Sequence, residues 1–233
     1  NLINMKTISC VAGHSLGEYS ALVCNSSLKF DNSVKLLKVR SKAMQESMPE
    51  GTGGMLALIG CSLEKVNKII EMTQNYGKVF VANDNAIGQI VISGEKNAIE
   101  YIENKSKKLE IKKAIKLPVS APFHCELINN AATVMDEEIS NYQFENFSVP
   151  LYSNVTAEKC SVQDIKKLLI KQIVSKVRWR EIVLNMIRDG VKNFVEIGPG
   201  SVLTNLVKRI SKEVKVISIS KTEDIDKLEA MKQ

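Results

Sequence analysis

The feature that most constrains this chain is the stretch CVAGHSLGEYSAL at residues 10–22, in which a serine stands between two glycines. An apolar, β-prone run at 8–12 precedes this motif, and a segment with helical spacing follows it. Strand, sharp turn and helix are the context in which Gly-x-Ser-x-Gly forms a nucleophile elbow with an exposed hydroxyl. We expect Gly13 and Gly17 to leave room for a strained turn, and Ser15 to be the nucleophile.

The same motif predicts part of an oxyanion site. The N–H of Leu16, at the start of the following helix, would point at an oxyanion formed on an acyl group attached to Ser15. Gly-x-Ser-x-Gly alone is a weak signal, because so short a pattern occurs by chance in many proteins. A turn that serves packing only is the alternative at this point.

The chain contains only two histidines, so few residues could act as the base. His14 lies inside the elbow, next to the serine, and is poorly placed to reach back to the hydroxyl. If a histidine activates Ser15, it is therefore His124. The alternative for His124 is a packed histidine near the start of the helix expected at 120–141.

The middle of the chain, residues 52–118, predicts a small inserted domain. Its elements follow the order β-α-β-β-α-β, the ferredoxin-like arrangement, after a glycine-rich linker at 50–54. Strands are expected at 55–60, 78–83, 89–93 and 112–117, and helices at 62–74 and 95–109.

Residues 1–51 and 119–233 form the larger, discontinuous domain of this α/β chain. Because helices alternate with strands there, we expect a parallel sheet covered by helices on both faces. Strands are expected at 8–12, 149–155, 194–197 and 214–220, and helices at 17–25, 33–48, 120–141, 162–174, 179–189 and 201–210, with a charged helix at the C-terminal end.

Arg40 lies within the helix expected at 33–48. Its neighbours predict a buried stripe near Val34, Leu37, Met44 and Met48. From composition alone, a solvated helix arginine is the favoured interpretation of Arg40.

Composition excludes several classes of function. The net charge of +6 comes from dispersed lysines without interleaved aromatics, which argues against nucleic-acid binding and leaves a surface suited to an acidic protein partner. Five scattered cysteines without CxxC spacing predict free thiols and neither a disulfide framework nor a metal site. No run approaches the roughly 20 apolar residues of a membrane helix, and no signal peptide is recognisable, so we expect a cytoplasmic protein without membrane contact.

Several motifs together resemble one family. They are GHSLGEYSAL at 13–22, RSKAMQ at 40–45, PEGTG at 49–53, PFH at 122–124 and EIGPG at 196–200. In this order they resemble the malonyl-CoA:acyl carrier protein transacylases of bacterial type II fatty acid synthesis, over essentially all 233 residues. The resemblance implies a hydrolase-like α/β domain with a ferredoxin-like insert.

The resemblance also implies roles for individual residues. Ser15 matches the acylated nucleophile and His124 the base of a serine–histidine dyad. Arg40 matches the arginine that pairs with the malonyl carboxylate.

Four further residues are expected to support this site. Gln172 matches the position whose main-chain carbonyl orients the histidine, and Asn154 matches an asparagine nearby. Phe123 resembles the residue found before the histidine in malonyl-selective acyltransferases, where its bulk would crowd an α-methyl branch. His14 is included because it belongs to the elbow motif.

By this resemblance, the chain is an acyltransferase of fatty acid biosynthesis. Malonyl would pass from malonyl-CoA to Ser15, and then to the phosphopantetheine thiol of an acidic acyl carrier protein in a ping-pong cycle. Both thioesters are substrates, so we expect no bound cofactor, and we expect a monomer.

Family members also carry a GQGSQ motif ahead of the elbow, whose glutamine supplies the other oxyanion donor. Residues 1–14 contain no counterpart and open on Asn1, so we expect a preceding segment, and much lower activity and stability without it. Two other functions stay open: a serine hydrolase, such as a thioesterase or patatin-like lipase, and a catalytically silent fragment that binds acyl groups or carrier protein.

Overall fold

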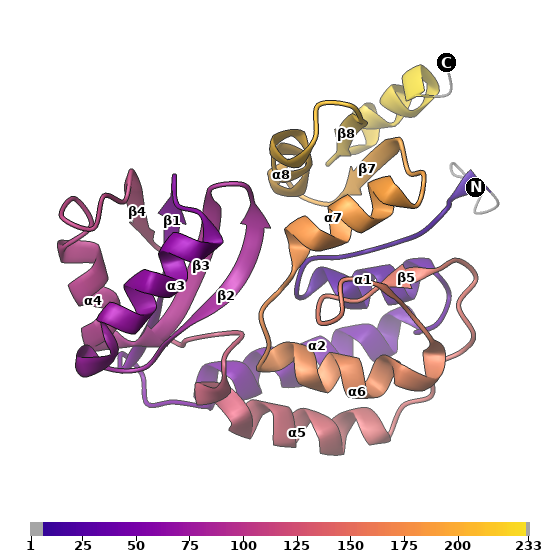
Figure 1. The fold of residues 1–233 in the computed structure, drawn as a ribbon. Helices are drawn as coiled ribbons and strands as arrows, with labels where there is room; N and C mark the ends of the chain where they lie inside the picture. Colours follow the sequence, from indigo (N-terminus) through magenta and orange to yellow (C-terminus); the bar gives the residue numbers. More distant parts are fainter. Residues whose placement is uncertain (1–6, 232–233) are drawn as a thin grey trace.

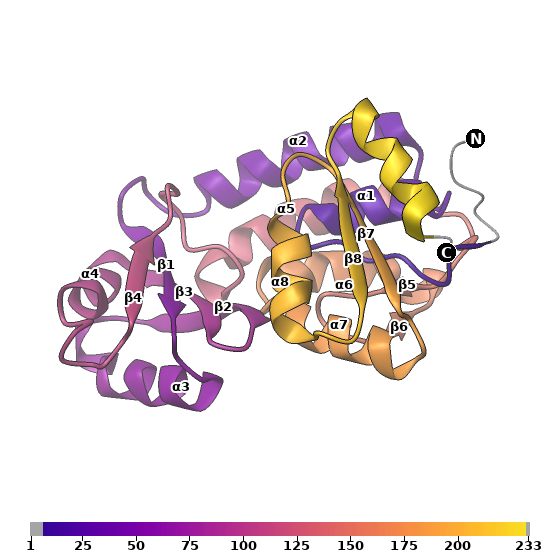
Figure 2. The same ribbon diagram turned by 90° about the horizontal axis from the view of Figure 1, so that it is seen from above.

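The computed structural model describes residues 7–231 and has a mixed α/β fold in two lobes (Figure 1). The smaller lobe consists of residues near 53–116, and the rest of the described chain forms the larger lobe (Figure 2). The boundaries expected at 52 and 118 stay predictions. The division into two independently folding domains stays a prediction.

The smaller lobe contains the six expected elements in the expected order. They are β1 (Gly53–Ile59), α3 (Leu63–Met72), β2 (Val79–Ala86), β3 (Gln89–Glu95), α4 (Lys96–Asn104) and β4 (Lys113–Lys116), with a short 3-10 turn, η2 (Gln74–Tyr76), after α3. The strands form one sheet in the order β2-β3-β1-β4, and each neighbouring pair is antiparallel.

Both faces of this sheet are covered. Successive side chains of a strand point to opposite faces, so neighbouring residues of β1 belong to different apolar clusters. Leu56 and Leu58 of β1 pack with buried residues of α3 and α4 in one apolar cluster. Met55 and Ala57, between and beside them, belong to another cluster that includes Phe123 of the larger lobe. The sheet therefore joins its own helices on one side to the larger lobe on the other.

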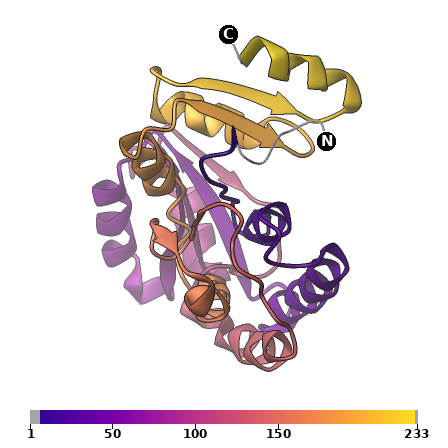
Figure 3. The ribbon, with the colours of Figure 1, turned by 90° about the vertical axis from the view of Figure 1, so that its right-hand side faces the viewer.

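The larger lobe is mostly helical. Its helices are α1 (Gly17–Cys24), α2 (Phe30–Glu46), α5 (Asn129–Ser140), α6 (Val162–Ile173), α7 (Trp179–Arg188) and α8 (Val202–Ile210), with 3-10 segments η3 (Glu126–Ile128) and η4 (Thr222–Met231). Its strands are β5 (Leu151–Tyr152), β6 (Lys159–Cys160), β7 (Asn193–Ile197) and β8 (Lys215–Ile219). Helices α1, α2, α5 and α6 share one apolar cluster, whereas α7 and α8 share another, and both α8 and η4 contact β8 (Figure 3).

The parallel sheet expected in the larger lobe is present only in pieces. Among the described strands, β7 and β8 are parallel, β5 and β6 are antiparallel, and Val11 forms an isolated parallel bridge with Leu151. The strand expected at 149–155 ends at Tyr152, because the chain turns back at Ser153 and Asn154 to pair with β6. With so short a partner, the segment 8–12 pairs at a single residue and is not a strand as expected.

The helix expected at 120–141 begins much later, at the 3-10 turn from Glu126, and becomes α-helical at Asn129. His124 has a φ of 62°, which right-handed helix does not allow. The expectation was wrong there, and the consequence is that His124 sits in a loop.

The buried stripe of α2 is also shifted from the expected one. Its buried residues are Ser33, Leu36, Arg40 and Met44, whereas Val34 is 50% exposed. Helical spacing fits either stripe, and the one that includes Arg40 packs on the rest of the lobe because the arginine finds buried polar partners there. The interpretation of Arg40 as a solvated surface residue was therefore wrong.

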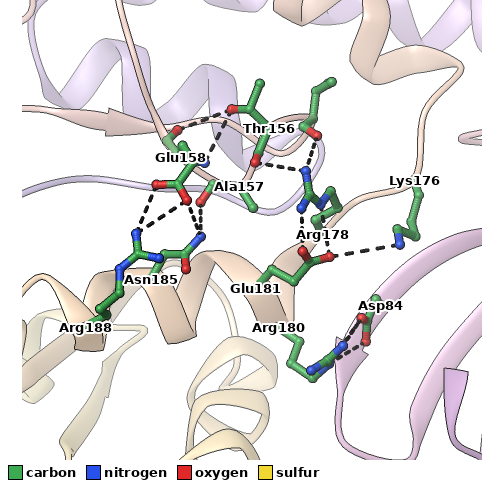
Figure 4. A network of polar contacts seen from close by, with 11 residues as sticks. Asp84, Thr156, Ala157, Glu158, Lys176, Arg178, Arg180, Glu181, Asn185 and Arg188 are labelled. Carbon is green, nitrogen blue, oxygen red and sulfur yellow. Dashed lines mark hydrogen bonds and ion pairs between the residues drawn. The ribbon is translucent and has the colours of Figure 1, made fainter.

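Polar contacts fasten the smaller lobe to α7 (Figure 4). Asp84 of β2, whose side chain is 1% exposed, accepts hydrogen bonds from both Nε and Nη2 of Arg180. Its main-chain N–H donates to Val177, 2.9 Å away. The end of β2 is thus held against the larger lobe. Within residues 7–231, no helix is long and apolar enough to cross a membrane.

Candidate active site

The turn at Ser15 is strained, as a nucleophile elbow requires. Ser15 has a φ of 52°, a conformation that residues with a side chain adopt rarely. A Cβ on Gly13 would lie 1.8 Å from the carbonyl oxygen of Gly17, so only glycine fits at position 13. At Gly17, by contrast, nothing in the described structure lies within 4 Å of the Cβ position, so steric room explains only the first of the two glycines.

Asn154 holds this turn in place from the loop after β5. Its Oδ1 accepts the Ser15 N–H at 2.7 Å, and its Nδ2 donates to the Gly13 carbonyl, also at 2.7 Å. The asparagine is fully buried, and its hydrogen bond to Gly13 is shielded from water, whereas the one from Ser15 is partly buried. These contacts offset part of the strain of the turn.

The structure brings Ser15 and His124 together although 109 positions separate them. Nε2 of His124 lies 2.8 Å from Oγ of Ser15, and Nδ1 lies 3.0 Å from the carbonyl oxygen of Gln172. A carbonyl oxygen can only accept, so Nδ1 carries the proton. Nε2 is then left with a lone pair that accepts the serine hydroxyl.

The environment keeps His124 neutral. Burial, followed by the nearby positive charge of Arg40, lowers the pKa of His124 to about 3, although its hydrogen bond to Gln172 acts in the opposite direction. At neutral pH the imidazole is therefore an unprotonated base that can take the proton of Ser15.

Arg40 is buried in the same cluster, with only 5% of its surface exposed. Its Nη2 donates to Oγ of Ser15 at 3.0 Å and to Oε1 of Gln172 at 2.8 Å, and its guanidinium lies 5.8 Å from the centre of the Tyr19 ring. Its Nε has no hydrogen-bond partner among residues 7–231. A cation beside the serine oxygen stabilises negative charge there, and the unpaired donor leaves capacity for a further acceptor.

The Leu16 N–H is free for an oxyanion. Within residues 7–231 it donates to no other group, whereas the N–H of Ser15 donates to Oδ1 of Asn154 and the N–H of Gly17 donates to the carbonyl of His14. The Leu16 side chain is 51% exposed, so the turn lies at the surface of the lobe. The motif that supplies the other oxyanion donor in the family has no counterpart in residues 1–14. Of these, residues 1–6 lie outside the described residues.

The two remaining expected residues support the site from outside the dyad. Nε2 of His14 is 2.8 Å from Oδ1 of Asn85 at the end of β2, and its ring packs edge-on against Trp179. His14 therefore joins the elbow to the smaller lobe. Phe123 packs against apolar clusters of both lobes, just before the loop histidine.

Sequence analysis missed Glu18 and Asn85. Glu18 is fully buried under the elbow, and burial raises its pKa to about 7. Its signal was an acidic residue in the first turn of α1, where a solvated helix end explains a glutamate equally well. Asn85 lies between the strands expected at 78–83 and 89–93, and it gave no signal.

These groups can perform acyl transfer. Among the described residues, a serine hydroxyl contacts a neutral imidazole and a buried guanidinium, which is an arrangement suited to nucleophilic attack on an acyl group. No group of three His, Cys, Asp or Glu side chains within 7–231 is arranged to hold a metal ion.

Comparison with known proteins supports this chemistry. The profile of the acyl transferase domain matches residues 7–229. A curated malonyl CoA-acyl carrier protein transacylase from Bacillus subtilis (strain 168) is 41% identical over 217 residues, which are 92% of this chain and 68% of the relative.

Solved structures agree over nearly the whole described fold. The crystal structure of acyl-carrier-protein-S-malonyltransferase from Bartonella henselae matches with a TM-score of 0.94 at 39% identity, over 98% of this chain and 74% of that chain. A malonyl-transacylase solved in complex with its type II PKS acyl-carrier protein matches with a TM-score of 0.90 at 37% identity, over 95% of this chain and 72% of that chain.

Proposed function

The chain belongs to the malonyl CoA-acyl carrier protein transacylases, a family with the acyl transferase domain, and we propose that it transfers malonyl from malonyl-CoA to acyl carrier protein through Ser15. The observation that carries this assignment of residues is the contact of one oxygen, Oγ of Ser15, with both the neutral imidazole of His124 and the guanidinium of Arg40.

In the first half-reaction, Ser15 attacks the thioester carbonyl of malonyl-CoA. His124 takes the hydroxyl proton at Nε2, the Leu16 N–H donates to the oxyanion, and the carbon–sulfur bond then breaks. The proton passes from His124 to the departing CoA sulfur, which leaves as a thiol. A malonyl ester remains on Ser15.

In the second half-reaction, the phosphopantetheine thiol of the carrier protein gives its proton to Nε2 of His124 and attacks the ester. The bond from the acyl carbon to Oγ breaks, and the serine regains its proton from His124. Since both acyl donor and acceptor are substrates, the proposal includes no resident cofactor.

Arg40 is the proposed partner of the malonyl carboxylate. A guanidinium offers two parallel donors to a carboxylate, which an ammonium group cannot reproduce. Loss of this partner would leave a desolvated carboxylate unpaired, at a cost of about 2–5 kcal/mol. Arg40 would therefore favour malonyl over acetyl.

The finer fold assignment belongs to the same proposal. The element order and the antiparallel sheet order β2-β3-β1-β4 support a ferredoxin-like insert. The strained turn at Ser15 supports a hydrolase-like larger domain. The five free thiols agree with the proposed cytoplasmic location.

Intact-mass measurement tests the proposal directly. Incubation with malonyl-CoA should add one malonyl group to Ser15, and phosphopantetheinylated carrier protein should then remove it. The matched Ser15→Ala variant should gain no mass.

Each alternative predicts a different result. Steady release of CoA and malonate without carrier protein would indicate a serine hydrolase. No adduct, with bound malonyl-CoA, would indicate a silent acyl-binding protein and would overturn the proposal.

A further inference from the structure

Glu18 is a buried charged group that the reaction above does not use. It lies in the first turn of α1, three residues after the nucleophile, and none of its surface is exposed. Its Oε2 accepts a hydrogen bond from Nε2 of Gln172 at 2.5 Å, and the Asn154 N–H lies 3.4 Å from both carboxylate oxygens. A buried carboxylate is costly unless its contacts compensate for lost water, so its partners matter.

Gln172 connects every part of the site. Its main-chain carbonyl accepts from Nδ1 of His124, its Oε1 accepts from Nη2 of Arg40, and its Nε2 donates to the Ser15 carbonyl at 3.0 Å as well as to Glu18. The amide must therefore present oxygen to Arg40 and nitrogen to the elbow.

A glutamine amide has nearly the same shape when its oxygen and nitrogen are exchanged. The exchanged amide would place its NH2 against the guanidinium of Arg40, where two donors repel. When ionised, the Glu18 carboxylate can only accept hydrogen bonds, so it favours the orientation of the amide with nitrogen toward itself. The Ser15 carbonyl contributes less to this preference for one amide orientation, because it also accepts the main-chain N–H of Glu18.

Glu18 also faces the other support of the elbow. The Asn154 N–H points at its carboxylate, and the side chain of the same asparagine holds Ser15 and Gly13. The Glu18 carboxylate thus lies between Gln172 and Asn154. Together these two residues hold the serine turn, the arginine and the histidine in place.

We propose that Glu18 is a positioning residue, which fixes the amide orientation of Gln172 and thereby aims Arg40 at the acyl site. This inference rests on the proposed function, since it assigns Arg40 to the malonyl carboxylate. It places Glu18 in the reaction only through Gln172, without contact to the substrate.

The test is Glu18→Gln, measured as the rate of malonyl-serine formation and as the ratio of malonyl to acetyl adduct. A misaimed arginine should slow acylation by about tenfold and lower that ratio. Burial raises the pKa of Glu18, so the ionised form is disfavoured in the folded protein, and the neutral variant should melt at the same temperature or higher.

A double-mutant cycle shows whether Glu18 acts through the amide. Gln172→Ala removes the side chain and keeps the carbonyl that binds His124. In that background, Glu18→Gln should slow acylation by less than about twofold. Additive effects would overturn the proposal.

Glu196→Gln is the matched control. The Glu196 carboxylate, on β7, accepts the N–H groups of Leu203 and Thr204 at 3.0 and 2.7 Å, and within residues 7–231 no hydrogen bond joins it to Ser15, His124 or Gln172. This variant should acylate at the unchanged rate.

The remaining outcomes are also decisive. A Glu18→Gln variant that acylates normally, or that loses activity only in proportion to its loss of folded protein, would give Glu18 a purely structural role. A wild-type chain without any malonyl adduct would instead refute the proposed function, so the two failures are distinguishable.

Discussion

The site around Ser15 and the sheet β1–β4 differ in the sequence separation between the residues that form them. The site gathers polar side chains from α1, α2, α6, the turn before α1 and the loops that contain His124 and Asn154, and its hydrogen bonds span as many as 157 positions. The sheet is formed entirely by residues within 53–116, and it buries aliphatic side chains between its strands and the helices α3 and α4.

This difference separates two physical problems. The sheet is stabilised by apolar area, to which many residues contribute interchangeably, whereas the site depends on individual donors and acceptors that must be paired. We therefore expect changes at the site to alter chemistry more than stability, and changes in the sheet to do the reverse.

Ser15→Ala should give the largest effect. Removing the nucleophile should slow malonyl transfer by about a thousandfold or more, while the free energy of unfolding changes by less than about 1 kcal/mol. Stopped assays of carrier-protein malonylation and urea unfolding measure the two quantities. A variant that loses both together would show that the site is also a main source of stability.

Ile92→Ala should produce the opposite result. Ile92 of β3 is fully buried in the cluster between sheet and helices, so truncation should lower the free energy of unfolding by about 2–5 kcal/mol. Transfer per folded molecule should be unchanged. The control Ile87→Ala, at a side chain 71% exposed in the same lobe, should change stability by less than about 0.5 kcal/mol.

Arg40→Lys tests whether charge alone is sufficient at the site. The lysine keeps a positive charge but loses the paired donors, so the preference for malonyl over acetyl should fall by about tenfold or more. Competition between the two CoA thioesters, with products separated by mass, gives this preference. An unchanged preference would mean that the arginine acts as a simple charge.

The pH dependence of acylation should show how strongly the site perturbs its base. A histidine with the ordinary pKa of about 6.5 would lose roughly tenfold of its neutral form at pH 5.5. With its pKa lowered to about 3, His124 stays neutral there, so acylation should not show this loss. Glu18, whose pKa is raised to about 7, could also change the rate in this range, and Glu18→Gln removes that contribution. A loss of acylation rate at low pH that persists in this variant would be due to protonation of His124.

The same shifts predict stability. Because folding lowers the pKa of His124, its unfolded form binds a proton below about pH 6.5 that the folded form refuses, so stability decreases as pH falls from 6.5 toward 3. Glu18 acts in the other sense. Its raised pKa disfavours the folded state as pH rises from about 4.5 through 7, and unfolding of Glu18→Gln across that range measures the difference.

Asn85→Ala should give the smallest effect. It removes the hydrogen bond between Asn85 and His14 where the two regions meet, at a cost of about 1 kcal/mol in unfolding free energy. Acylation should fall by less than tenfold, because His14 does not contact Oγ of Ser15. A loss as large as that of Ser15→Ala would mean that the smaller lobe controls the elbow.

Local patterns were sufficient to predict much of this fold. The order of elements in β1–β4 was predicted correctly, because strand alternation and turn residues act between neighbours in sequence. The turn at Ser15 was predicted for the same reason, since the space needed at Gly13 is a property of one short segment.

The elements that were predicted wrongly depend on distant partners. The strand after 149 is short because its pairing ends at Tyr152, and the helix after 120 starts late because His124 occupies a loop that reaches Ser15. Composition alone favoured a solvated Arg40, and only its contacts with Gln172 and Ser15 explain the buried stripe of α2.

The sequence by itself determined which residues could do chemistry: a serine in a strained turn, a single remote histidine and an arginine in a recognisable motif. The tertiary structure alone decided that these groups meet and that Glu18 and Gln172 lie beneath them. The physical reason is that apolar periodicity has many equivalent solutions, whereas a buried polar group is stable only where its particular partners converge.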